Sequence, residues 1–174
     1  MQPSHIQFIK AYEAYSDDLF RYSLFKLNDR ELAKDLLQET FARSWQYLER
    51  GTSVGNIKAF LYKIIANLII DEYRKRKPND SLETLQEEGF EPSFDDTDRW
   101  MNVMDGTEAL KLISQIPTPY GEAVFMRYVQ ELSLGEIADI TGETENTIAV
   151  RIHRGLNKLR SLFYHETTNT AGKA

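Results

Sequence analysis

The sequence predicts an all-α protein made of two small helical domains joined by an acidic linker. Apolar residues recur at helical spacings of three and four, and capping residues or Gly and Pro breakers stand where those segments end. No segment sustains the alternation of a half-buried strand. With 174 residues, of which 41% are hydrophobic, the chain is long enough for one ordinary domain or two small ones.

Charge divides the chain further. The net charge is −6, but residues 79–104 alone hold eight acidic side chains and one basic side chain. This stretch also contains a glycine, a proline and no sustained period, which is linker composition. We therefore expect a first domain at residues 1–78, the linker at 79–104, a second domain at 105–165 and a flexible tail at 166–174.

The first domain begins with apolar periodicity from Ile6 to Leu27, which fits either one helix or two with a cap at residues 16–18. Asn28 and Asp29 predict the start of a strong helix that runs to Arg50 and is ended by Gly51. Its expected inner stripe is Ala33, Leu37, Phe41, Trp45 and Leu48. Polar residues on a different face include Asp35, Gln38, Glu39 and Arg43.

A third helix is expected from Ile57 to about Lys77, before Pro78. Spacings of four, four and three place a polar file along one side, and the helix ends in a basic cluster suited to phosphates. Phe60, Tyr62 and Tyr73 add rings that could stack on an unpaired base. The alternative is that the basic last turn only complements the helix dipole and that Asp71 pairs with a neighbouring cation. The file is Lys63, Asn67, Asp71 and Arg74, and the cluster is Arg74, Lys75, Arg76 and Lys77.

The second domain contains the most informative stretch. After a short helix from Thr107 to Ile116, and another with Pro119 at its first position, Ser133 and Glu136 form a capping box. The helix they begin has Ile137, Ala138 and Thr141 on its inner face and ends at Gly142, and Thr144 caps the next helix. That helix has one buried stripe, at Ile148, Ile152, Leu156 and Leu159.

Two short helices, a glycine turn and a basic second helix are typical of a DNA-binding helix-turn-helix. Off the stripe lie Arg151, Arg154, Lys158 and Arg160, with no acidic residue between Ala149 and Arg160. The alternative is an ordinary helical hairpin with a solvated charged face.

Sequence patterns for catalysis and metal binding are missing. The three histidines, His5, His153 and His165, have no ligand spacing, there are no cysteines, and no phosphate-binding glycine loop or nucleophile motif occurs. We expect no catalytic residue, no metal, no cofactor and no enzymatic activity. Without a long apolar run or a signal peptide, we expect no membrane insertion and a cytoplasmic protein.

The two informative stretches resemble the extracytoplasmic-function group of bacterial RNA polymerase sigma factors, which keeps only the second and fourth conserved regions. DLLQETFARSW, at 35–45, resembles the start of the second region, and IKAFLYKIIANLIIDEYRKRK, at 57–77, resembles its promoter-opening part. Residues 116–160 resemble the fourth region over its whole length. The resemblance covers most of residues 17–162.

The resemblance implies a sigma factor that binds core RNA polymerase and promoter DNA, is monomeric when free, serves a stress or envelope regulon and is held by an anti-sigma factor. It implies a polymerase-binding face of Asp35, Gln38, Glu39 and Arg43. It implies that the loop at 48–56 and the third helix read the minus-ten element through Lys63, Asn67, Asp71, Arg74, Lys75 and Arg76. It implies minus-thirty-five contacts by Glu145, Asn146, Thr147, Val150, Arg151, Arg154 and Lys158.

Six positions depart from the family pattern. Glu143, Thr144 and Glu145 replace residues that are more often apolar, proline and aliphatic, and the two glutamates bring acids to the groove-facing end. Ala149 stands where a lysine is common, and Tyr120 and Gly121 replace a more polar, often basic pair. These changes either weaken DNA attraction or, for Glu145, specify a base. Two other functions fit the sequence less well. One is a free-standing transcriptional regulator whose first domain senses or dimerises, and the other is a helical adaptor whose basic faces are only solvated.

Overall fold

The computed structural model describes residues 3–76 and 106–172, which are helical with short connections and contain no strand. The chain divides into two compact units, one before residue 85 and one from that residue onward. The all-α prediction is therefore confirmed for the described residues. The predicted acidic linker, residues 79–104, lies outside them.

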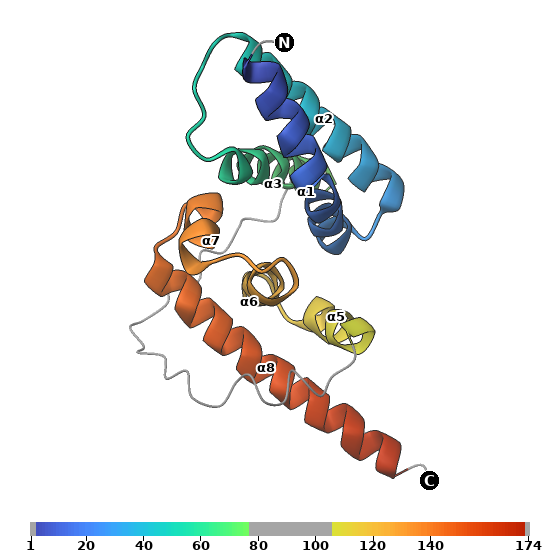
Figure 1. Ribbon diagram of the computed structural model, residues 1–174. Helices are drawn as coiled ribbons and strands as arrows, with labels where there is room; N and C mark the ends of the chain where they lie inside the picture. The colour runs from blue at the N-terminus through green and yellow to red at the C-terminus, as the bar shows by residue number, and fades with distance from the viewer. Residues whose placement is uncertain (1–2, 77–105, 173–174) are drawn as a thin grey trace. The chain divides into compact units, whose positions relative to one another are not determined.

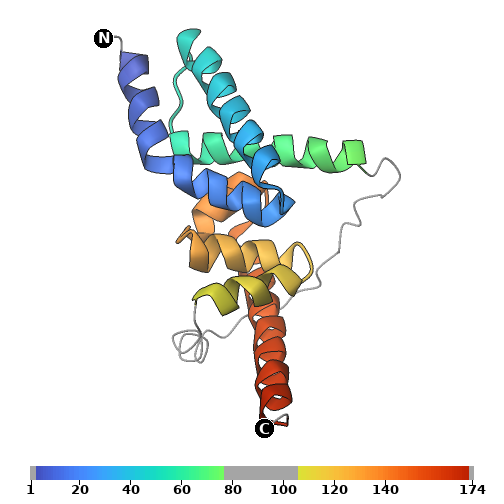
Figure 2. The ribbon, with the colours of Figure 1, turned by 90° about the vertical axis from the view of Figure 1, so that its right-hand side faces the viewer.

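The first unit is a three-helix assembly of α1 (Pro3–Leu27), α2 (Arg30–Glu49) and α3 (Ile57–Arg76). Each helix contacts the other two, and α3 crosses both α1 and α2 (Figures 1 and 2). The segment that fitted one or two helices is thus a single helix, α1. Most of the stability of a helix in a protein comes from tertiary packing, and α1 packs against both α2 and α3. This packing explains why the helix continues through the candidate cap at residues 16–18.

Short polar signals set the ends of these helices. The Asp29 side chain accepts the N–H of Leu32 at 3.0 Å, and this N-cap begins α2. Gly51 follows α2 with φ +76°, a conformation that costs glycine little. Asn56 accepts the N–H of Ala59 at 3.0 Å and begins α3. The first two signals were predicted from the sequence, whereas the cap at Asn56 was not.

The buried face of α2 is broader than the predicted stripe. Leu37 and Trp45 are only partly buried, while Leu36, Thr40 and Ser44 are buried. The reason is that α2 packs against both α1 and α3, so two adjacent faces lose water. The buried hydroxyls are tolerated because each donates to a carbonyl of its own helix, Thr40 to Leu36 at 2.7 Å and Ser44 to Phe41 at 2.8 Å.

The second unit is organised around one long helix, α8 (Glu145–Ala171). It is contacted by α5 (Gly106–Gln115), α6 (Tyr120–Val124) and α7 (Leu134–Thr141), and η1 (Phe125–Val129) joins α6 to the segment before α7 (Figure 1). The predicted core stripe of α8 is confirmed. Ile148, Ile152, Leu156 and Leu159 are all buried.

Three expectations for this unit differ from the structure. Pro119 is the N-cap of α6 rather than its first helical residue. The following helix changes to a π-helix at η1, where the N–H of Gln130 bonds to the carbonyl of Phe125 at 3.2 Å. The tail expected to be flexible from residue 166 continues α8 to Ala171, and Glu166 pairs with Lys111 of α5 at 3.6 Å.

The crossing of α6 and α8 depends on a glycine. A Cβ added at Gly155 would lie 2.5 Å from Cγ2 of Val124 and 2.8 Å from the carbonyl oxygen of Tyr120. No side chain fits in that space, so Gly155 allows the two backbones to approach closely. This contact holds α6 against the first half of α8.

Among the described residues, no helix combines the length and the apolar character needed to cross a membrane.

Candidate nucleic-acid interface

The predicted helix-turn-helix is present in α7 and α8. Ser133 and Glu136 form the capping box, Gly142 ends α7 with φ +74°, and Thr144 accepts the N–H of Thr147 at 3.1 Å at the start of α8. The inner face of α7 differs in one position. Thr141 is exposed and donates to the carbonyl of Ile137 at 2.8 Å, while Ile140 is buried in its place.

The minus-thirty-five candidates fall into three classes of exposure. Val150 is only 4% exposed, so its side chain cannot reach a base edge without moving. The sequence predicted Val150 as an accessible contact, and the structure instead places it in the core. Thr147 is partly buried, and its hydroxyl lies 2.9 Å from that of Thr144, within the cap. Glu145, Asn146 and Lys158 are exposed, and Arg151 and Arg154 are partly buried.

Arg151 is paired within the unit. Its Nη2 donates to Oε1 of Glu143 at 2.8 Å, and the two side chains are 16% and 39% exposed. Glu143 lies in the turn and Arg151 lies in the second turn of α8. The ion pair therefore spans the cap at Thr144 and joins the turn to the helix that follows it.

The other departures from the family pattern also have structural roles. A Cβ added at Gly135 would lie 3.4 Å from Oε1 of Glu145, which places that carboxylate beside the first turn of α7. A negative charge there complements the helix dipole. Ala149 is buried, so this position contributes neither a charge nor a polar group to the surface of α8. The Lys158 ammonium lies 5.7 Å from the centre of the Tyr120 ring.

In the first unit, the residues proposed from the resemblance for the minus-ten element are all exposed on α3. The cations at its end lie close to acids: Lys75 to Glu72 at 3.0 Å, and Arg74 to Asp71 at 3.8 Å. The alternative pairing of Asp71 with Arg74 is thus present in the structure. Arg76 reaches Asp29, the N-cap of α2, at 3.6 Å.

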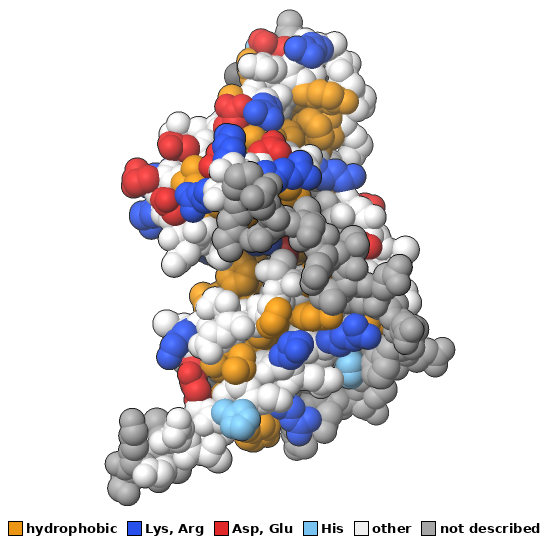
Figure 3. All heavy atoms as spheres, turned by 180° about the vertical axis from the view of Figure 1, so that it is seen from behind, with side chains coloured by type: hydrophobic (Ala, Val, Ile, Leu, Met, Phe, Trp, Pro, Cys, Tyr) orange, Lys and Arg blue, Asp and Glu red, His pale blue; other side chains and the backbone are white. Residues whose placement is uncertain are grey.

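These exposed pairs give the first unit a mixed surface. Figure 3 shows acidic and basic side chains intermixed on one of its faces. Ion pairs this exposed contribute about 0–1 kcal/mol each, so a phosphate can replace the carboxylate at little cost. The pairing with acids therefore does not exclude these cations from binding DNA.

The three candidate stacking rings have different surroundings. Tyr62 is fully buried and packs edge-on against Tyr22 with ring centres 5.7 Å apart, so it is a core residue and the prediction for it is wrong. Phe60 is partly buried beside Tyr47, at 4.9 Å. Tyr73 is 43% exposed, and its hydroxyl donates to the carbonyl of Lys26.

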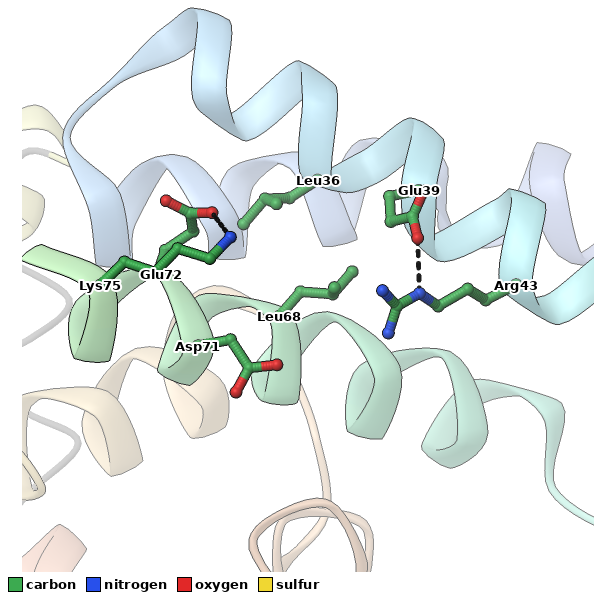
Figure 4. Close-up of a pocket in the computed structure, with 7 residues that line it drawn as sticks. All are labelled: Leu36, Glu39, Arg43, Leu68, Asp71, Glu72 and Lys75. Atoms are coloured by element: carbon green, nitrogen blue, oxygen red, sulfur yellow. Dashed lines mark hydrogen bonds and ion pairs between the residues drawn. The ribbon is translucent and has the colours of Figure 1, made fainter.

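The predicted polymerase-binding residues are all exposed on α2, with Arg43 donating to Glu39 at 2.6 Å. A groove of about 450 Å³ runs between α2 and α3 beside them. Leu36 and Leu68 form its apolar part, and Figure 4 shows the Glu39–Arg43 and Glu72–Lys75 pairs on either side. Asp71 also lines the groove, so a residue proposed to contact the minus-ten element lies beside Glu39 and Arg43 of the proposed polymerase face.

The described residues place no group of three or more histidines and carboxylates where they could hold a metal ion.

Comparisons with known proteins match both units. The family model described as "Sigma-70 region 2" matches residues 11–78, and "Sigma-70, region 4" matches residues 107–159. RNA polymerase sigma factor SigV of Bacillus subtilis is 30% identical over 151 residues, covering 84% of each chain. ECF RNA polymerase sigma factor SigW of the same organism is 29% identical, covering 85% of this chain and 84% of the relative.

A solved structure has a similar fold. It is the sigma factor RpoE from Bartonella quintana, in complex with the anti-sigma factor NepR. The superposition has a TM-score of 0.66 at 21% identity and covers 91% of this chain and 97% of the other.

Proposed function

Because this chain belongs to the extracytoplasmic-function group of RNA polymerase sigma factors, we propose that its exposed faces divide polymerase binding and promoter recognition between the two units. The protein binds core RNA polymerase and directs transcription initiation at promoters, with no catalytic step of its own. The face of Asp35, Gln38, Glu39 and Arg43 on α2 contacts polymerase. The exposed side of α3 contacts the minus-ten element, and the start of α8 contacts the minus-thirty-five element.

The observation that carries this proposal is the order and separation of the two matched segments. Each segment lies in its own compact unit, and each unit presents an exposed polar face on a well-packed helix. Promoter elements are separated along DNA, so two independent reading units suit them. The net charge of −6 also suits a protein that reaches DNA together with polymerase rather than alone.

The minus-ten role of α3 is supported by the chemistry of its exposed side chains. Asn67 offers both donors and acceptors for a base edge, and Lys63 and Lys75 offer cations for the backbone. A base taken out of the stack costs a few kcal/mol and needs compensating contacts. Tyr73, which is exposed in the last turn of α3, can supply a surface on which that base stacks.

The experiment is co-elution of the purified chain with bacterial core RNA polymerase on a sizing column. We expect the wild type to co-elute and Glu39→Lys to lose co-elution, because a cation replaces the central acid of the proposed face. Glu13→Lys is the matched control, since Glu13 is an exposed acid of α1 outside the proposed faces. That variant should co-elute like the wild type.

A second variant separates polymerase binding from the intramolecular pair. Glu39→Arg combined with Arg43→Glu keeps an ion pair on α2 but exchanges its charges. If the exchanged pair restores co-elution, the pair is only structural and the proposed polymerase face is wrong. If the wild type does not co-elute, while the free chain binds duplex DNA tightly, the protein is a free-standing regulator instead.

The proposal includes an inhibitory protein partner. The solved Bartonella structure contains such a partner bound to its sigma factor, and the groove beside the α2 face offers a surface that both polymerase and an anti-sigma factor could use. We propose that the protein acts in the cytoplasm, is monomeric when free, and serves a stress or envelope regulon. A partner identified by co-purification should compete with core polymerase in the sizing assay.

A further inference from the structure

The ion pair between Glu143 and Arg151 is unlike the other pairs on the proposed DNA-binding faces. Arg74, Lys75 and Arg76 are at least half exposed in their pairs, whereas the side chain of Arg151 is only 16% exposed. Its partner is also fixed differently. Glu143 follows Gly142, whose left-handed conformation and bond to the carbonyl of Ala138 at 2.9 Å fix the start of the turn.

The direction of the pair also matters. Long side chains on a helix point toward its N-terminus, so the guanidinium of Arg151 reaches back along α8 to the turn. There it meets a carboxylate at 2.8 Å in a charge-assisted hydrogen bond, which is stronger than a neutral one. A phosphate that approaches Arg151 must therefore also approach the negative charge of Glu143, or displace it.

We propose that Glu143 is a positioning residue that holds Arg151 out of phosphate contact, so that α8 binds DNA through one cation fewer than its sequence suggests. The inference rests on the proposed function only in taking the start of α8 as the DNA-facing surface. Its consequence is a lower affinity for DNA of any sequence, because phosphate contacts supply most non-specific binding.

The test measures non-specific binding by the full chain. A mixed-sequence duplex is titrated by fluorescence anisotropy between about 50 and 200 mM salt, a range over which phosphate contacts change affinity strongly. Glu143→Gln should bind more tightly than the wild type, with a salt dependence of log K against log salt steeper by about 0.9, the value for one added phosphate contact. The ratio of its affinity to that of the wild type should therefore fall by roughly 3.5-fold as salt rises across that range.

A double-mutant cycle shows whether the gain depends on Arg151. In the Arg151→Gln background, Glu143→Gln should no longer steepen the salt dependence. Glu145→Gln is the matched control, because it removes a carboxylate two residues away whose neighbour is the first turn of α7 rather than Arg151. Its effect should be equal in both backgrounds.

Three results would overturn the inference. The first is that Glu143→Gln changes the affinity and its salt dependence equally with and without Arg151, which would mean that the gain comes only from removing a negative charge. The second is weaker binding by Glu143→Gln, which would mean that the pair orients Arg151 for DNA or supports the fold. The third is an absence of binding by both the wild type and Glu143→Gln.

The polymerase assay distinguishes this failure from failure of the proposed function. Co-elution of the wild type with core polymerase, without coupling between Glu143 and Arg151, rejects only the positioning role. Coupling without co-elution keeps the positioning role and rejects the sigma-factor assignment of the faces.

Discussion

The two units differ in how far packing changes the surface that their sequences suggest. On α3 of the first unit, the polar side chains proposed to contact the minus-ten element are all exposed, and their ion pairs lie in solvent. On α8 of the second unit, Val150 is buried, the Thr147 hydroxyl lies within a cap, and Arg151 is paired with Glu143. Helical spacing thus identified accessible residues well in the first unit and less well in the second.

The difference has a structural cause. The polar file of α3 follows one exposed side of a long helix, so periodicity alone separates it from the core. The start of α8 instead follows a tight turn, where side chains of the turn and of the cap reach the first two turns of the helix. In such a place, local contacts decide which polar groups remain available for DNA.

The largest expected effect concerns the aromatic side chains of the first unit. Tyr62→Ala should lower the free energy of unfolding by about 3–5 kcal/mol, because it empties a fully buried site beside Tyr22. Urea unfolding followed by circular dichroism measures this loss. Tyr73→Ala is the contrast: it should cost about 1 kcal/mol or less, since this ring is 43% exposed. Equal losses would show that both rings belong to the core.

An intermediate effect is expected at the helix crossing in the second unit. Gly155→Ala should lower the free energy of unfolding by about 2 kcal/mol, because the new Cβ would meet the backbone of α6. The cost of this overlap is larger than the gain of about 1 kcal/mol that alanine brings in helix propensity. Gly106→Ala is the control, since nothing lies within 4 Å of its added Cβ. A Gly155→Ala protein that melts at or above the wild-type temperature would contradict the close approach of α6 and α8.

The smallest effect on stability is expected at an exposed ion pair of α3. Lys75→Gln should change the free energy of unfolding by less than about 0.5 kcal/mol, yet lower the salt dependence of binding to mixed-sequence single-stranded DNA by about 0.7 if Lys75 contacts a phosphate. Lys34→Gln removes a similar exposed pair, Lys34 with Glu31 at 2.9 Å, outside the proposed DNA-binding face. Equal salt dependences for the two variants would remove Lys75 from that face.

Much of the fold could be predicted from the sequence because its signals are local. Asp29, Gly51, the capping box of Ser133 and Glu136, and Gly142 each act through hydrogen bonds or backbone angles within a few residues. The π-helix at η1 and the burial of Thr40 could not be predicted in this way. The burial of Thr40 depends on packing against helices distant in the sequence, and its hydroxyl is satisfied within its own helix. Nothing in the structure explains the π-helix.

The candidate site shows the same division. The sequence by itself determined the helix-turn-helix, the polar files of α2 and α3 and the family resemblance, because periodicity and spacing follow from residues close in the chain. Only the tertiary structure decided that α2 and α3 enclose a groove lined by both faces, that Tyr62 is a core residue, and that Glu143 binds Arg151. The physical reason is that accessibility and pairing depend on which side chains the packed helices bring together in space.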